Sequence, residues 1–165
     1  MALDVQILGS AELKKLAAQI KAAGDKGLGT ELGKAMREAG KPVERSIRAE
    51  YKGLPASGGY AGVFSKSLRF RTSLRTTARS ASFRLLTFAD GTHERRDINK
   101  LEAGQLRHPI FGRSRSGRKG ERIANPWAVT AVRGGFHKRG TDHAADEAEK
   151  QMDHVVSEFA DRLIG

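Results

Sequence analysis

The histidines are the first residues to test for chemistry, because an imidazole can bind a metal or move a proton near neutral pH. A helical metal site usually pairs two histidines four residues apart, with an acid nearby. His143 and Glu147 have that spacing, but no second histidine joins them. The pattern favours a solvent-exposed helix face, and we expect no metal site. The five histidines are His93, His108, His137, His143 and His154.

Nucleophiles and phosphate-binding loops are equally poorly supported. The chain has no cysteine, which excludes a thiol nucleophile and any cysteine-ligated metal. It has no GxSxG segment of the kind that presents a catalytic serine. The segment GLGTELG at 27–33 has the wrong spacing for GxGxxG and lacks the P-loop lysine, so a turn between helices explains its glycines better. We therefore expect no enzymatic activity, no catalytic residue and no cofactor.

The segment RSRSGRKGERIAN at 113–125 is the most distinctive candidate for binding. Each of its basic side chains could neutralise one phosphate without reading a sequence. The segment has no aromatic residue that could stack on single-stranded bases. Contact with DNA, contact with a partner protein and a solvated loop all remain open. The basic residues are Arg113, Arg115, Arg118, Lys119 and Arg122.

Charge is distributed unevenly along the chain, whose formal net charge is +11. Residues 1–44 have a net charge of +1, residues 45–139 of +15 and residues 140–165 of −5. A basic middle is typical of nucleic-acid binding. It also fits self-assembly, in which the acidic end of one subunit meets the basic face of the next. No apolar run approaches the roughly 20 residues that span a bilayer, so we expect no membrane contact.

Two helices are predicted in the first third of the chain. The first follows an N-cap at Ser10, has apolar residues at helical spacing and ends at Gly24. The second is longer, is capped by Thr30 and passes through Pro42. A proline inside a helix removes a backbone donor and clashes with the preceding turn, so we expect a kink at 38–42.

Strands and a further helix are predicted in the middle of the chain. Polar and apolar residues alternate at 68–72 and again at 81–87, which predicts two antiparallel strands joined by a short connection. A short helix is predicted around 98–103 and a third strand at 127–132. Thr141 is the predicted N-cap of a last helix.

The last helix has the clearest amphipathic pattern. We expect its stripe to be buried, with Met152 and Phe159 as its largest members. The element order indicates an α+β fold and a single domain over 1–165, in which N-terminal helices and a C-terminal helix pack on a small, mainly antiparallel sheet of three or four strands. A long basic loop at 113–125 interrupts it. The stripe consists of Ala145, Ala148, Met152, Val155, Val156, Phe159 and Leu163.

Several short segments occur in an order that is typical of one protein family. They are AGKPV at 39–43, SLRFR at 67–71, LRHPIFG at 106–112, Trp127 in a strand, the step Gly135-Phe136 and the amphipathic C-terminal helix. With these, the chain resembles the phage tail-component family of long-tailed phages, and most of all its actinobacterial-phage branch. These small proteins of the head–tail junction are also described as neck, head–tail joining or tail-completion proteins. The resemblance covers nearly the whole chain.

Two segments depart from the family pattern. Many members have an Asp-Thr-Gly step before the first strand of the arginine-rich pair, where this chain has GGYAGVFSKS at 58–67. The family is usually shorter between Gly112 and Trp127, so the basic segment resembles an insertion.

The resemblance implies a structural virion protein without enzymatic activity. It implies a ring of six or twelve copies around the DNA channel, which joins the head connector to the tail. The implied partners are further copies of the chain, a connector or stopper protein, a tail terminator or tube protein, and genomic DNA. The implied location is the head–tail junction of the virion, and the host cytoplasm during assembly. The alternatives are a tail terminator ring that caps the tail tube and a basic nucleic-acid-binding protein.

Structural roles are expected for several single residues. We interpret 106–112 as a rigid corner that aims the basic segment, because Pro109 fixes a backbone angle, restricts His108 and is followed by the flexible Gly112. Phe111 and Trp127 are expected to anchor the end of the sheet from which the segment leaves. Pro42 and Phe136 mark the matched steps AGKPV and Gly135-Phe136.

Overall fold

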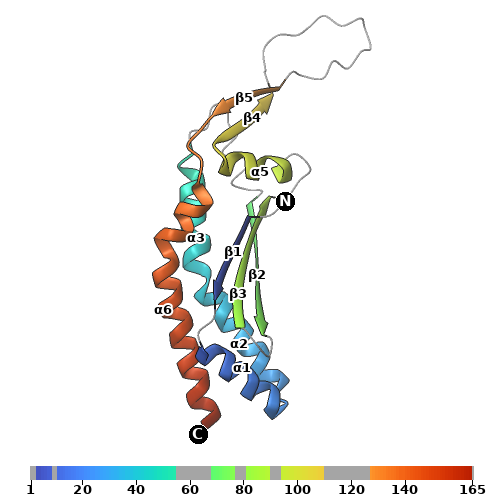
Figure 1. Cartoon of the computed structure of the whole chain (residues 1–165), viewed down its shortest axis with the longest axis vertical. Coiled ribbons are helices and arrows are strands. Elements are labelled where there is room, and N and C mark those ends of the chain that lie inside the picture. Colours follow the sequence, from blue (N-terminus) through green and yellow to red (C-terminus); the bar gives the residue numbers. More distant parts are fainter. Residues whose placement is uncertain are drawn as a thin grey trace, which may run out of the picture.

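The computed structural model describes residues 3–8, 11–54, 68–76, 81–89, 94–109 and 127–164. Helices and two small antiparallel sheets form an elongated molecule, which confirms the predicted α+β class (Figure 1). The elements are, in order, β1 (Leu3–Leu8), α1 (Ala11–Ala23), α2 (Lys26–Ala39), α3 (Lys41–Lys52), β2 (Leu68–Thr76), β3 (Ala81–Ala89), α5 (Glu94–Glu102), β4 (Gln105–Pro109), β5 (Trp127–Ala131) and α6 (Phe136–Ile164).

The larger sheet has the strand order β1-β3-β2, with both pairs antiparallel. The pairing of β2 with β3 confirms the prediction from their short connection. The strand β1 was not among the predicted elements, although Leu3, Val5 and Ile7 alternate with Asp4 and Gln6. Because β1 pairs with β3, the central strand is β3, and its Phe83 and Leu85 are each only 1% exposed.

Helices cover one side of this sheet. In Figure 1, α6 and α3 run beside each other along it, while α1 and α2 lie at its lower end. Ile47 of α3 and Ala148 of α6 are fully buried in the seam between their helices. A side chain at Gly140 would place its Cβ 2.6 Å from the Cα of Ile47, so the two backbones meet there at glycine distance.

The predicted kinked helix is two helices. α2 ends at Ala39 and α3 begins at Lys41, so Pro42 lies in a first helical turn, where a missing N–H costs no hydrogen bond. Gly40 separates the helices, and a Cβ there would collide with the ring of Phe83. The predicted cap at Thr30 was also wrong, because Asp25 caps α2 by accepting a hydrogen bond from the N–H of Leu28 at 2.9 Å.

The last helix begins earlier than predicted. α6 starts at Phe136, so Thr141 lies inside it and donates its hydroxyl hydrogen bond back to the carbonyl of His137 at 2.8 Å. The cap comes instead from Glu102 of α5, whose carboxylate accepts hydrogen bonds from the N–H groups of His137 and Lys138 at 2.9 and 3.2 Å. Because Glu102 is far from α6 in the sequence, the residues around Thr141 contain no local pattern that reveals this cap.

The predicted third strand does not join the larger sheet. β5 pairs with β4 in a separate two-stranded ribbon, which stands at the end of the molecule beyond α5 (Figure 1). Of the predicted corner at 106–112, the residues up to Pro109 form strand β4 instead, with His108 and Pro109 opposite Ala128 and Trp127, and residues 110–112 lie outside the described residues. The predicted short helix is confirmed as α5.

Candidate assembly surfaces

The outer side of the larger sheet carries a row of arginines. Side chains alternate across a strand, so Arg69, Arg71 and Arg75 of β2 lie on the side away from the helices, and all three are exposed. Arg84 of the central strand lies on the same side, because the register places it opposite Ser73. We call Arg69, Arg71, Arg75 and Arg84 the arginine face.

Only part of this positive charge is neutralised within the chain. Arg84 donates hydrogen bonds to both carboxylate oxygens of Asp4, at 2.6 to 2.8 Å. These hydrogen bonds lower the pKa of Asp4 from its usual value, which favours the ionised carboxylate. Within the described ranges, no acidic side chain forms an ion pair with Arg71 or Arg75. Two exposed guanidinium groups are therefore available to an outside partner.

Apolar side chains border the arginines. Leu86 and Phe88 of β3 lie opposite Arg71 and Arg69 on the same side of the sheet, and both are half-buried. Arginine stems can pack on such apolar surface while the charged groups remain in solvent. The arginine face therefore offers charge and apolar area together, which is the composition of many protein interfaces.

The outer side of α6 carries acids at helical spacing. Asp142, Asp146, Glu149 and Asp153 follow each other in steps of four, three and four, so they form one row, and all four are exposed. Lys138 pairs with Asp142 at 2.6 Å. Among the described residues, no basic side chain pairs with Asp146, Glu149 or Asp153. We call these four residues the acidic row.

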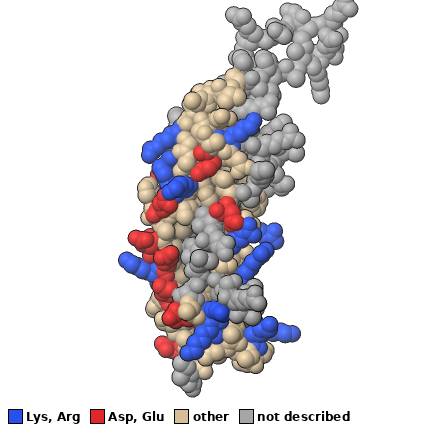
Figure 2. Space-filling view, viewed as in Figure 1, with Lys and Arg blue, Asp and Glu red and all other residues tan. Residues whose placement is uncertain are grey.

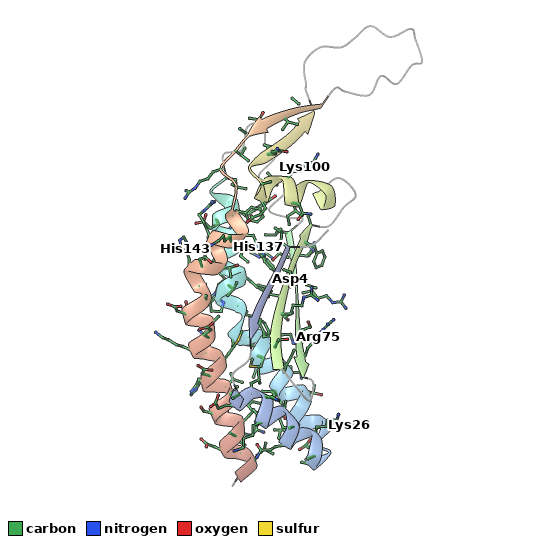
Figure 3. All side chains as sticks on the ribbon, in the orientation of Figure 1. Asp4, Lys26, Arg75, Lys100, His137 and His143 are labelled. Atoms are coloured by element: carbon green, nitrogen blue, oxygen red, sulfur yellow. The ribbon has the colours of Figure 1, made fainter. Side chains whose placement is uncertain are left out.

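The two charged surfaces lie on different sides of the molecule. In Figure 2 the acidic side chains gather along the side formed by α6, and basic side chains stand out on the opposite side, where the sheet lies. Figure 3 shows Arg75 and Asp4 on the sheet side, while His143 of α6 points the other way. Because the helices α3 and α6 and the core lie between them, the two surfaces cannot meet within one copy.

A closely packed junction between the end of α5 and the start of α6 fixes the position of α6 relative to the ribbon. Besides capping α6 through its carboxylate, Glu102 accepts a hydrogen bond from the N–H of Gly135 at its backbone carbonyl, at 2.7 Å. Gly104 accepts one from the N–H of Val132 at 2.9 Å. A Cβ on Gly134 would lie 2.6 Å from both the Glu102 carbonyl oxygen and the Gly104 nitrogen, so only glycine fits. The junction therefore sets the direction in which the ribbon leaves.

Titratable groups at the start of α6 are used for structure. His137 is 6% exposed and its Nε2 lies 3.0 Å from the hydroxyl of the fully buried Thr87. Burial lowers the pKa of His137, so its ring is neutral at pH 7. Arg139 donates a hydrogen bond to Glu50 of α3 at 2.7 Å, and this bond lowers the pKa of Glu50. Both groups tie α6 to its neighbours.

The ribbon connects directly to the basic segment. Pro109 and Trp127 form the last pair of the β4–β5 register, and the basic segment lies between these two residues in the sequence. The two faces of the ribbon differ. Leu106 on one face is buried against the body, whereas Val129 on the other face is 62% exposed. The predicted contacts of Arg113, Arg115, Arg118, Lys119 and Arg122 lie outside the described residues, as do Phe111 and Gly112.

No arrangement for catalysis emerges from the residues that the structure describes. Among them, no three histidine or acidic side chains converge as metal ligands would, and no helix is long and apolar enough to cross a membrane. The Nδ1 atom of His143 lies 3.6 Å from a carboxylate oxygen of Glu50, which belongs to α3. Glu147, the acid at helical spacing from His143, belongs to α6. A cavity of about 370 Å³ between α1, α2 and Leu74 has mainly small and aliphatic walls, and its Asp25 carboxylate is engaged as the cap of α2.

The predicted structural residues divide into two groups. Pro42, Phe136, Met152 and Phe159 are all buried, and the last three are 0%, 5% and 4% exposed. The backbones of His108, Pro109 and Trp127 lie in the ribbon. Sequence reasoning missed Glu102 and the Glu50–Arg139 pair, which have no local pattern. The alternation of Arg69 and Arg71 with apolar residues was a usable signal for the arginine face.

Comparison with protein-family models, with curated proteins and with solved structures found no match to this chain. The function is therefore inferred from the two charged surfaces and from the sequence segments described above.

Proposed function

We propose that this chain is a structural subunit of a ring at the head–tail junction of a long-tailed phage, where it joins the head connector to the tail and lines the DNA channel. One observation carries the proposal. The arginine face and the acidic row lie on different sides of one elongated body, and each has charges without a partner among the described residues.

A ring requires two different surfaces on each subunit. In a head-to-tail contact, one surface of a copy meets the other surface of the next copy, and the series closes when the rotation per copy divides a full turn. A chain with one self-complementary patch would instead stop at a two-fold dimer. The arrangement in this chain supports the first mode of association, because like charges oppose a face meeting its own copy.

The head–tail junction is proposed on the sequence segments. AGKPV at 39–43 forms the boundary between α2 and α3, SLRFR at 67–71 supplies half of the arginine face, and Gly135-Phe136 begins α6. The ribbon ends at Pro109 and Trp127, and the basic segment, which lies between these two residues in the sequence, is proposed to contact a neighbouring ring or the DNA. In this role the chain holds its partners by surface contacts, uses no cofactor and performs no catalytic step.

Electron microscopy tests the proposal at two levels. The purified chain, alone or mixed with its neighbouring connector and tail proteins, is expected to form closed rings with a central channel. Phage particles that lack the chain are expected to accumulate as filled heads and separate tails. A chain that stays monomeric both alone and in the mixture, together with normally joined particles in its absence, would contradict the proposed function.

The two alternatives give different results in the same work. A tail terminator ring would leave tails of uncontrolled length when the chain is absent, because nothing would then cap the growing tube. A nucleic-acid-binding protein is favoured by one observation, which is that Arg71 and Arg75 are exposed and form no ion pair with any acid that the structure describes. Such a protein would remain monomeric and bind duplex DNA with an affinity that falls steeply as salt rises.

A further inference from the structure

We propose that the acidic row of one copy docks on the arginine face of a second copy, so that α6 of each subunit lies across the outer side of its neighbour's sheet. This inference rests on the proposed function and adds the contact that would hold the ring together. It brings the arginine face of one copy against the acidic row of the next, with Asp146 near Arg71 and Asp153 near Arg75.

Charge complementarity is the first argument for this occupant. The partner of the arginine face must bring several negative charges on one line, and the acidic row has four acids on one line of α6. Three of them have no basic partner among the described residues. DNA could neutralise the arginine face, but it could not pair with the acidic row, because both are negatively charged. A second copy of the chain satisfies both surfaces at once.

The spacing of the charges also agrees. Asp146 and Asp153 are seven residues apart on a helix, which corresponds to about 10 Å. Arg71 and Arg75 are four residues apart on a strand, which corresponds to about 13 Å. Long arginine side chains can absorb the difference of about 3 Å, because four rotatable bonds separate the guanidinium group from the backbone. One helix that lies along β2 can therefore contact both arginines.

The uncharged surroundings suit a close contact. Beside the acidic row, Ser157 is exposed and Ala145 and Ala160 are half-buried, so small side chains lie next to these acids together with the exposed Lys150. On the sheet, half-buried Leu86 and Phe88 supply apolar area next to the arginines. Docking would remove this apolar area from water and would strengthen the ion pairs by excluding solvent.

A charge-reversal experiment tests the contact directly. The variant R71E/R75E reverses the charge at the two contact positions of the sheet, and the variant D146K/D153K reverses it at the two contact positions of the helix. Each variant alone opposes like charges and is expected to remain monomeric where the natural chain assembles. An equimolar mixture is expected to assemble, because the reversed helix then meets the reversed sheet and the two natural faces also meet. K14E/K15E on α1 has the same charge change as R71E/R75E and is expected to assemble normally.

A cross-linking experiment keeps the inference testable if assembly is weak. The chain has no cysteine, so an R71C/D146C variant contains only the two introduced thiols. Oxidation is expected to give a ladder of disulfide-linked dimers, trimers and larger species. The control K15C/D146C, which replaces the sheet position with one on α1, is expected to give no such ladder.

The outcomes separate this inference from the proposed function. Rings that form in the charge-reversed variants, without a ladder from R71C/D146C, would refute this contact and leave the ring proposal intact. No rings from the natural chain with its neighbours, and no ladder, would refute both. Loss of duplex DNA binding in R71E/R75E, again without a ladder, would assign the arginine face to nucleic acid and overturn the inference.

Discussion

The inner and outer sides of α6 differ in composition and in what they contact. On the inner side, Ala148, Met152 and Phe159 are at most 5% exposed and pack on the other helices. On the outer side, Asp146, Glu149 and Asp153 are exposed and form no ion pair within the described part of the chain. The difference indicates that one helix has two tasks, which are to hold the subunit together and to present charge to a neighbour. Mutations on the two sides should therefore separate stability from assembly.

The largest effect on stability is expected on the inner side, at Phe159. Phe159→Ala removes a ring that is 4% exposed and leaves a cavity between α6 and its neighbours. The free energy of unfolding should fall by about 3–5 kcal/mol. Thermal and urea unfolding of the variant would measure this loss. An unchanged melting temperature would show that the inner side contributes little to stability.

A smaller loss is expected from overfilling the seam between α3 and α6 at Gly140. A Cβ at this position lies 2.6 Å from the Cα of Ile47, and a backbone cannot rotate away as a flexible side chain can. Gly140→Ala should therefore force α3 and α6 apart and cost about 1–3 kcal/mol. Gly33→Ala is the matched control, because its Cβ would meet nothing within 4 Å. Equal unfolding curves for the two variants would contradict the close approach.

A pH-dependent loss of stability is expected from His137, where the inner side of α6 meets β3. Burial lowers its pKa from the usual 6.5 in the folded chain. Below that value the unfolded chain binds a proton that the folded chain does not bind, so stability should fall as pH decreases from 6.5 towards the lowered pKa. Urea unfolding between pH 7 and pH 5 would show a slope that His137→Gln reduces and that the exposed control His154→Gln retains.

The smallest effect on stability is expected on the outer side. Asp146 and Asp153 are exposed and unpaired among the described residues, so D146K/D153K should change the free energy of unfolding by no more than about 0.5 kcal/mol. The same variant should lose assembly under the proposed contact. A large drop in melting temperature would show that these acids stabilise the subunit itself and would remove the distinction between the two sides.

The sequence predicted those parts of the fold that depend on periodicity. The alternation predicted the strands β2 and β3, their short connection predicted that they pair, and the stripe of α6 predicted the burial of Met152 and Phe159. The start of α6 was missed because its cap, Glu102, comes from another element. The missed strand β1 did have a local signal, since Leu3, Val5 and Ile7 alternate with polar residues.

The candidate surfaces were only partly visible in the sequence. The net charges of the three segments indicated complementary regions, but composition does not show on which side of the molecule each charged side chain lies. The fold shows these directions. Side-chain alternation along β2 points Arg71 and Arg75 away from the core, and the packing of the inner side of α6 on the core leaves the acids on a different side of the molecule. The separation of β5 from the larger sheet could not be predicted, since it depends on which strand lies near β4 in space.

Sedimentation velocity of the two charge-reversed variants, alone and mixed, tests the central claim most directly. The claim is that opposite faces of neighbouring copies meet through the acidic row and the arginine face. It predicts slow, monomeric boundaries for R71E/R75E and for D146K/D153K, and a fast boundary of the natural size for their equimolar mixture. Natural-size assemblies from either variant alone, or monomers from the mixture where the natural chain assembles, would contradict it.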